Sequence, residues 1–344
     1  MSGTPSFERF NYLLRTNKHI ERKLVFDLLQ EASVRIGFSE HWYLGFGSMW
    51  FGDFRLADRQ LGIRDMISVE CDQAARADYN RPFGGVQVIE GMSGDAIKAF
   101  PQERWQRPVI AWLDYDGALT EDVIADVDGI LQNAAPNSVL VITLNGTRGT
   151  YRARRTDGMH TREETGVGVI ESLLGGSSIA ARFQPTQTPA GAWRDVTDGL
   201  FPECLADAVS TYMQHRIMRL ARTHAGQRLV FYPLYLLHHK DGTDMVTVGG
   251  AIAPEMDDSP WHKSLASQRI LAGGGGNAAT FNRLDLIPLT IKEKMALDTC
   301  LPIPQDDQAF LAQARQIGLQ LADAEMMKYR RFYRHFPMFV ETPL

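Results

Sequence analysis

The chain has 344 residues, of which 44% are hydrophobic and 22% charged, and its formal net charge is −5. This composition is ordinary for a globular protein, and the length allows one large domain with a smaller appendage. No apolar run approaches the roughly 20 residues that span a bilayer, and the start lacks the apolar core of a signal peptide, so we expect a cytoplasmic protein without membrane contact. The three cysteines are never in a C-x-x-C spacing, which argues against a disulfide framework or a zinc knuckle.

The first forty residues are predicted to form an N-terminal helical segment. In "HIERKLVFDLLQEASVRIGF" the apolar side chains recur at helical spacing with the charged side chains opposite, and Gly37 is a plausible end. The apolar stripe consists of Ile20, Leu24, Val25, Leu28 and Leu29.

Residues 41–145 alternate between short β-branched or aromatic runs and amphipathic stretches. The strand-like runs lie at 42–45, 66–70, 86–90, 109–115 and 138–144. This alternation predicts a parallel sheet with helices on both faces.

The remaining sequence predicts how this domain ends. Residues 146–200 have the composition of a loop-and-helix insertion, and a helix is expected from about 202 to 225. Two further strand-like runs flank the turn Asp241–Gly242, a hairpin signal. We therefore predict an α/β, Rossmann-like domain over 41–255, whose mostly parallel sheet finishes with an antiparallel hairpin. Residues 256–344 are expected to form a mainly helical C-terminal extension.

Glycines follow the first predicted strand. Gly45, Gly47 and Gly52 precede a probable helix, where glycine lets the backbone approach a ligand and the helix start offers free N–H groups. The dinucleotide fingerprint G-x-G-x-x-G is not met, because its sixth position is Trp50. A nicotinamide-dependent enzyme is therefore disfavoured.

Acidic residues follow the next three predicted strands. Glu70 ends the second strand, Asp95 follows the third in "SGDA", and "LDYDG" closes the fourth with Asp114, Tyr115 and Asp116. The carboxyl ends of parallel strands share one edge, so we expect one crevice there. Glu70 can accept both ribose hydroxyls of an adenosine group. The simpler alternatives are a solvated strand end for Glu70 and helix caps for the aspartates.

Together, "LGFGSMWFGDF", "MISVECD" and "WLDYDG" resemble the class I S-adenosylmethionine-dependent methyltransferases, and within them a group of bacterial proteins labelled as O-methyltransferases. The resemblance covers residues 40–255 and implies methyl transfer from S-adenosylmethionine to an oxygen or nitrogen nucleophile of an unknown acceptor. It also implies a cofactor site in which Gly45 and Gly47 face the methionine part with Ser48 beside them, Glu70 the ribose, Asp95 the adenine amino group, and Asp114 the methionine amine or the substrate.

The loop departs from the family pattern in one respect, because bulky Phe46, Met49 and Trp50 replace the usual small residues. The rival interpretation is a catalytically inactive, methyltransferase-like scaffold that has lost the cofactor. In either case the aromatic C-terminal extension is a candidate surface for a homo-oligomer or a larger complex.

Methyl transfer needs an aligned nucleophile and, for a hydroxyl or amine, removal of a proton. Asp114, Tyr115 and Asp116 are the candidate catalytic residues. Asn145 ends the fifth strand beside them, and two aspartates with an asparagine supply oxygen ligands that Mg²⁺ accepts. Because this pattern is short and common, we do not predict a metal site.

Two basic clusters are candidates for anion or nucleic-acid contacts. The first follows the fifth strand and contains Arg148, Tyr151, Arg152, Arg154, Arg155 and Arg162. It predicts a lid for an anionic or nucleotide-containing acceptor, with Arg152, Arg154, Arg155 and Asn145 binding the substrate. The alternative is a solvated loop.

The second cluster has basic residues at helical spacing: His215, Arg216, Arg219 and Arg222. Such spacing fits either a basic stripe that binds anions or the solvent-facing side of an amphipathic helix. The pair His238–His239, just before the hairpin turn, is expected to be an exposed strand end.

Overall fold

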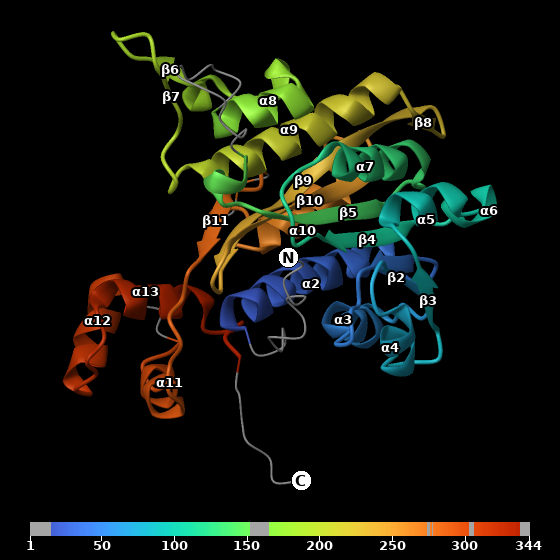
Figure 1. The fold of residues 1–344 in the computed structure, drawn as a ribbon. Coiled ribbons are helices and arrows are strands. Elements are labelled where there is room, and N and C mark those ends of the chain that lie inside the picture. Colours follow the sequence, from blue (N-terminus) through green and yellow to red (C-terminus); the bar gives the residue numbers. More distant parts are fainter. Residues whose placement is uncertain (1–14, 152–164, 274–275, 277, 303–305, 338–344) are drawn as a thin grey trace.

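The computed structural model describes residues 15–151, 165–273, 276, 278–302 and 306–337, and it shows one central sheet with helices on both faces (Figure 1). The strand order is β11-β9-β10-β5-β4-β1-β2-β3, and β8 (Thr223–His224) pairs with β9. The five predicted parallel strands are β1 (Trp42–Gly45), β2 (Met66–Glu70), β3 (Val86–Glu90), β4 (Val109–Asp114) and β5 (Ser138–Asn145).

The predicted terminal hairpin consists of β9 (Gln227–Lys240) and β10 (Asp244–Pro254). β10 lies antiparallel to both β5 and β9. Lys240 pairs with Asp244, so the turn lies between them and contains Gly242 with φ of 119°, a value that glycine adopts readily. A mostly parallel sheet with a terminal antiparallel hairpin and helices at both ends confirms the predicted fold class.

Two local details differ from the sequence pattern. β11 (Phe281–Leu284) lies in the region expected to be mainly helical, and it pairs in parallel with β9. A four-residue strand gives too short a pattern to recognise, and here its partner strand determines its conformation. The helix expected over 202–225 is α9 (Phe201–Leu220), which ends before β8. The domain boundaries at 40 and 255 stay predictions.

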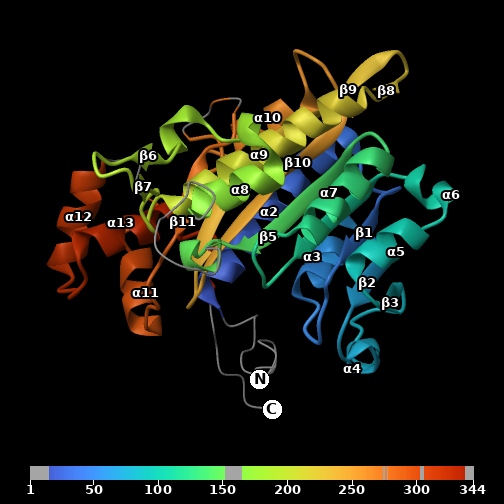
Figure 2. The same cartoon turned by 45° about the horizontal axis from the view of Figure 1, so that its top comes forward.

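Two groups of helices cover the two faces of the sheet, as Figures 1 and 2 show. One group packs into the core cluster that contains Phe26, Phe54 and Trp261, and the other into the cluster that contains Ile97, Ile130 and Ile217. The first comprises α2 (Thr16–Ile36), α3 (Gly52–Leu61) and α10 (Pro260–Ser267), and the second α5 (Ser93–Ala99), α7 (Glu121–Asn133), α8 (Gly166–Leu174) and α9.

The remaining elements are peripheral. α4 (Ala74–Tyr79) and α6 (Gln102–Trp105) are short, and within 146–200 a small β6–β7 sheet (Thr186–Gln187 and Trp193–Arg194) accompanies α8. The C-terminal helices α11 (Ile291–Asp298), α12 (Asp307–Gln316) and α13 (Asp323–Phe332) gather beyond the β11 edge (Figure 1).

The position of α2 is set by the tip of the β9–β10 hairpin. Asp241 Oδ2 accepts the Lys18 backbone N–H at 2.8 Å, and Asp241 Oδ1 accepts that of Asn17 at 3.3 Å. The carboxylate thus satisfies donors that a helix leaves open at its first turn and lies at the positive end of the helix dipole. The predicted apolar stripe faces the sheet, with Ile20, Leu24 and Leu28 fully buried.

Candidate functional site

A cavity of about 550 Å³ lies at the carboxyl ends of β1, β2 and β4, where the start of α2 borders it. This volume lies within the range of small-molecule sites, roughly 300–1,000 Å³. Seven of the residues predicted for the site line it: Gly47, Ser48, Glu70, Asp114, Tyr115, Asp116 and Asn145. The edge of the parallel sheet therefore gathers these residues into one cavity.

The loop after β1 is fastened to the end of β2. Gly47 N donates to Ser68 Oγ at 2.8 Å, and Ser48 N donates to Glu70 Oε1 at 2.9 Å. Ser68 Oγ donates to the same Glu70 oxygen at 2.6 Å. Burial raises the pKa of Glu70 more than these hydrogen bonds lower it. A carboxylate has about four acceptor positions, so two bonds at Oε1 leave capacity for a ligand.

The glycine at 47 is required by the chain itself. A Cβ there would lie 2.4 Å from the Phe51 ring and 2.9 Å from Ser68 Oγ. The backbone after this glycine is left-handed at two non-glycine residues, with φ of 47° at Ser48 and 49° at Phe51. Such conformations cost energy, and they gather at ligand sites where the surrounding structure enforces them.

Gly45 and Asp95 are outside the cavity lining. Gly45 is buried in β1, where a Cβ would lie 3.1 Å from the Trp112 carbonyl oxygen, so its smallness serves strand packing. Asp95 is exposed in the first turn of α5, where a carboxylate favours the helix dipole. The structure thus does not bring these two predicted cofactor contacts to the other residues.

The bulky loop residues form part of the wall. Phe46 and Trp50 line the cavity, and the Phe46 ring packs edge-on against Tyr115 with 5.2 Å between centroids. Among the described residues, Trp50 Nε1 is a buried donor without a hydrogen-bond partner. An unpaired buried donor at a cavity wall suits a ligand that brings an acceptor atom.

Asp114, at the end of β4, is paired with a buried lysine from α2. Lys18 Nζ lies 2.9 Å from each carboxylate oxygen of Asp114 and 2.9 Å from Glu21 Oε2. Burial disfavours the Lys18 ammonium, but the two carboxylates outweigh it and raise its pKa. Burial also acts on Glu21, yet His239 and Lys18 hold the pKa of its carboxyl well below the usual value.

The charged residues of α2 were missed by the sequence analysis, which placed charges on the exposed face. Lys18 and Glu21 are 4% and 0% exposed. Their spacing from Leu24 and Leu28 puts them on the buried stripe, and that spacing was the available signal. Arg15 and Arg22 also line the cavity from this end of the chain.

Tyr115 and Asn145 already have internal partners. The Tyr115 hydroxyl donates to Asp126 Oδ2 at 2.6 Å, and burial together with that carboxylate raises the pKa of Tyr115. Asn145 Oδ1 accepts the Thr147 N–H at 2.9 Å. Asp116 is exposed at the cavity, and the helix cap considered for it is provided instead by Thr120.

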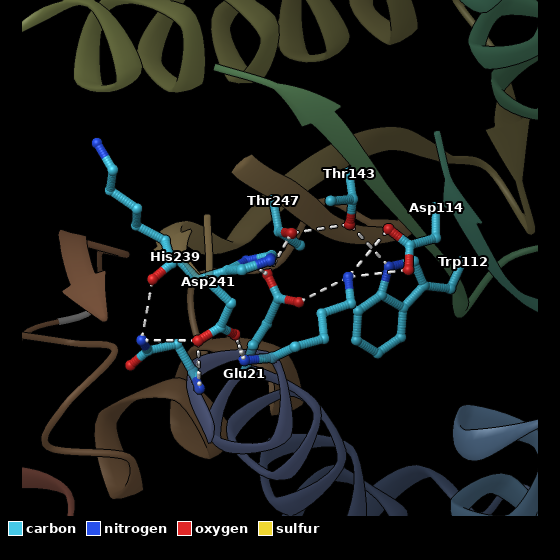
Figure 3. Close-up of polar contacts among 10 residues, drawn as sticks. Glu21, Trp112, Asp114, Thr143, His239, Asp241 and Thr247 are labelled. Carbon is cyan, nitrogen blue, oxygen red and sulfur yellow. Dashed lines mark hydrogen bonds and ion pairs between the residues drawn. The ribbon is translucent and has the colours of Figure 1, made fainter. Parts of the chain in front are cut away.

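The expectation for the histidine pair was wrong. His238 and His239 are 4% and 3% exposed, because α2 and β11 cover the end of β9. His238 Nε2 lies 2.9 Å from Asp244 Oδ1. His239 Nδ1 lies 3.0 Å from Glu21 Oε1 (Figure 3), and His239 lines the cavity.

Most of the predicted arginine lid, including Arg152, Arg154 and Arg155, lies outside the described residues. At its start, Arg148 Nε pairs with Asp198 at 2.6 Å. Tyr151 is buried, and its hydroxyl donates to the Asn145 carbonyl at 2.8 Å, so it is not placed to stack on a base.

The second basic cluster has structural partners. Arg216 pairs with Asp128 at 3.0 Å. The Arg222 guanidinium donates to the carbonyls of Leu131 and Ala134, both at 2.6 Å, at the end of α7. These two arginines therefore bind the protein itself.

The described part of the chain has neither clustered metal ligands nor a membrane-spanning helix. Its histidines, cysteines, aspartates and glutamates form no group of three or more suited to a metal ion. None of its helices combines the length and apolar character needed to cross a membrane.

Similar solved structures share low sequence identity with this chain. The plantazolicin methyltransferase BamL, in complex with triazolic desmethylPZN analog and SAH, is 11% identical with a TM-score of 0.37, and the match covers 73% of this chain and 91% of that chain. The 1,6-didemethyltoxoflavin-N1-methyltransferase of Burkholderia thailandensis is 11% identical with a TM-score of 0.32, over 66% and 78% of the two chains. LepI in complex with SAM is 11% identical with a TM-score of 0.33, over 65% of this chain and only 46% of that chain, so this chain spans less than half the length of LepI.

A comparison with curated protein sequences gives no match. Residues 10–344, nearly the whole chain, match a protein family described as "Putative O-methyltransferase". This match confirms the predicted resemblance to class I methyltransferases, and S-adenosylmethionine is the cofactor that the resemblance implies. The chain belongs to this O-methyltransferase family.

Proposed function

We propose that the chain transfers a methyl group from S-adenosylmethionine to an oxygen atom of an acceptor, inside the cavity at the ends of β1, β2 and β4. The observation that carries this proposal is that the anchored loop, Glu70 and Asp114 line the same cavity. The family description favours oxygen over nitrogen as the acceptor atom.

The cofactor residues proposed are those at the ends of β1 and β2. Glu70 binds the ribose hydroxyls with its remaining acceptor positions, and the loop at Gly47 and Ser48 borders the methionine part. The Trp50 indole N–H is a donor for the cofactor's acceptor atoms. When bound, the cofactor supplies a methyl group on a positively charged sulfur, which the acidic ends of the strands favour electrostatically.

Asp114 is proposed to orient rather than to remove a proton. Its two carboxylate oxygens already face the Lys18 ammonium at 2.9 Å, so both are engaged in an ion pair. It can still accept a hydrogen bond from the methionine amine. Asp116, Tyr115 and Asn145 border the acceptor end of the cavity.

The acceptor is proposed to carry an acidic group. Arg15, Lys18 and Arg22 line the cavity at and just before α2, opposite the acidic ends of the strands. Guanidinium groups bind carboxylates and phosphates in a fork geometry. Contact with Arg152, Arg154 and Arg155, and hence selection of a nucleotide-containing acceptor, remains a prediction.

The test is a transfer assay with S-adenosylmethionine labelled in its methyl group. Acceptors are offered in matched sets: phenols, catechols, carboxylic acids and nucleotides as oxygen nucleophiles, and amines as nitrogen nucleophiles. We expect transfer to acidic oxygen acceptors, with a lower rate in Asp114→Asn, which keeps the size but removes the charge. Transfer to amines alone contradicts oxygen as the acceptor atom, and absence of cofactor binding favours the scaffold interpretation.

Assembly through the C-terminal extension also remains a prediction. Ile291 and Met295 on α11 are each 62% exposed and lie one turn apart, so this helix offers an apolar surface to a second copy of the chain. Light scattering of the wild type beside Met295→Asp checks this. A monomeric wild type contradicts it.

A further inference from the structure

We propose that His239 is the general base of the reaction and that Glu21 is the residue that positions it. This inference rests on the proposed function, because it assigns the proton acceptor for the oxygen nucleophile. The two side chains come from segments far apart in the sequence, Glu21 from α2 and His239 from the end of β9. They meet side by side (Figure 3), and His239 lines the cavity whereas Glu21 does not.

The surroundings of Glu21 keep its carboxylate ionised. Its Oε2 lies 2.9 Å from the Lys18 ammonium, and its Oε1 accepts a hydrogen bond from the Thr247 hydroxyl and lies 3.0 Å from His239 Nδ1. The ammonium and the hydroxyl both donate. A fully buried carboxylate beside an ammonium and a hydroxyl donor stays charged and acts only as an acceptor.

A chain of hydrogen bonds from the sheet ends on the same carboxylate. Trp112 Nε1 donates to Thr143 Oγ1 at 3.0 Å, and the Thr143 and Thr247 hydroxyls lie 2.8 Å apart (Figure 3). The Thr247 hydrogen points to Glu21, so Thr143 must donate to Thr247. The direction of the whole chain is thereby fixed, and Glu21 is its final acceptor.

This arrangement fixes the tautomer of His239. Because Glu21 only accepts, the hydrogen on the facing ring nitrogen must belong to Nδ1. A neutral imidazole then carries a lone pair on Nε2, the nitrogen left for a ligand in the cavity. A carboxylate that orients a histidine in this way gives the second ring nitrogen the role of base.

The proton then has a defined route. The acceptor oxygen forms its bond to the methyl carbon as the carbon–sulfur bond breaks, the bonding electron pair stays on sulfur, and the hydroxyl proton passes to His239 Nε2. The products are the methyl ether, S-adenosylhomocysteine and an imidazolium, which releases its proton to solvent. Glu21 remains ionised and stabilises the imidazolium without taking the proton.

Charged groups of several elements lie near His239. Glu21 on α2 contacts its Nδ1, Lys18 and then Asp114 lie behind that carboxylate, and Arg15, Arg22 and Asp241 line the same cavity. His238 precedes it on β9, and the residues paired with it on β10 and β11 are Met245 and Leu284.

The tautomer can be measured without an acceptor. Protein labelled with ¹⁵N-histidine is examined by long-range ¹H–¹⁵N spectroscopy at pH 8, and the His239 signals are assigned by their loss in His239→Asn. We expect Nδ1 to carry the hydrogen in the wild type and this preference to be lost in Glu21→Gln. His239 present as the Nε2–H tautomer, or as an imidazolium from pH 6 to 9, would overturn the proposal.

The second arm measures catalysis with any acceptor that the labelled-methyl assay identifies. Loss of a general base lowers kcat by about 10²–10⁴-fold, so we expect that loss in His239→Asn with nearly unchanged affinity for S-adenosylhomocysteine. Glu21→Gln should shift the pH profile of kcat, a readout that lost packing alone does not change. The control is His238→Asn, which alters the neighbouring histidine outside the cavity lining.

The outcomes separate this inference from the proposed function. A wild type that does not bind S-adenosylhomocysteine contradicts the proposed function, and the spectroscopic tautomer then decides the inference alone. A wild type that is active while His239→Asn retains its kcat overturns the inference and leaves the proposed function standing.

Discussion

Lys18 Nζ lies 2.9 Å from both carboxylate oxygens of Asp114, which joins the first turn of α2 to the end of β4. The same ammonium also faces the Trp112 ring, 5.4 Å from Nζ to the ring centroid. The N-terminal helix is therefore a wall of the cavity as well as a cover for the sheet. Changes in this helix should affect both stability and ligand binding.

Replacing Lys18 with methionine should destabilise the fold strongly. The change removes the cation between Glu21, which is fully buried, and Asp114. Breaking a buried ion pair by removing one partner costs about 3–5 kcal/mol. Urea unfolding measures this, with Lys263→Met as the control, because the exposed Lys263–Asp258 pair should contribute at most about 1 kcal/mol. Equal losses in the two variants would argue against a buried charged pair.

Glu70→Gln should weaken binding of S-adenosylhomocysteine, because the ribose hydroxyls lose a charged acceptor. A hydrogen bond to a charged group contributes about 1.5–3 kcal/mol, which corresponds to a loss of roughly 10- to 150-fold in affinity. Asp95→Ala should leave the affinity unchanged, since Asp95 is exposed outside the cavity lining. Calorimetry compares the three proteins. Weaker binding of S-adenosylhomocysteine by Asp95→Ala would support the contact between Asp95 and the adenine that the sequence predicted.

His41 should make the fold sensitive to mild acid. It is 3% exposed, and burial lowers its pKa from 6.5 to about 4. Between pH 6.5 and 4, His41 is therefore protonated in the unfolded chain and neutral in the folded chain. The stability from this group is complete above pH 6.5 and falls by about 3 kcal/mol as the pH drops through that window.

Unfolding free energies at pH 7 and pH 4.5, compared between wild type and His41→Gln, isolate this contribution. The comparison is needed because burial also lowers the pKa of His19 to about 4, which adds loss in the same direction. The variant should show a smaller drop between the two pH values. An identical drop in both proteins would exclude His41 as a source.

Arg222→Met should destabilise the protein without affecting any nucleic-acid binding. Its guanidinium satisfies two carbonyls at the end of α7, and leaving buried acceptors unpaired costs about 1–3 kcal/mol. Arg219, one turn earlier and exposed, should tolerate the same change with an effect within about 0.5 kcal/mol. Thermal unfolding tests both variants. Equal stability of the two variants would show that Arg222 does not stabilise the fold through these two carbonyls.

The sheet was predictable because its strands are strongly patterned and its turns are marked. The runs ending at Gly45, Glu70 and Asp114 are buried, short and rich in β-branched or aromatic residues, and they became β1, β2 and β4. Convergence of their ends follows from parallel topology alone. β11 was missed because its four residues depend on pairing with β9, which no local pattern reveals.

The charged interior was not predictable by the rule that charges face water. Lys18, Glu21 and His239 are buried together because each forms an ion pair or hydrogen bond with another, which offsets the cost of burying charge. The contact between Glu21 and His239 joins residues about 220 positions apart in the sequence. Two threonines in buried strands, Thr143 and Thr247, were a signal in the sequence. Polar residues at strand positions that pack inward indicate a hydrogen-bonded network.

The central claim, that the cavity binds S-adenosylmethionine for methyl transfer, is tested most directly by a crystal structure with S-adenosylhomocysteine. We predict the ligand in the cavity, with its ribose hydroxyls within hydrogen-bond distance of Glu70. We also predict that the sulfur faces the side lined by Asp114 and His239. A ligand bound elsewhere, or a cavity without ligand in crystals grown at saturating concentration, would contradict the account.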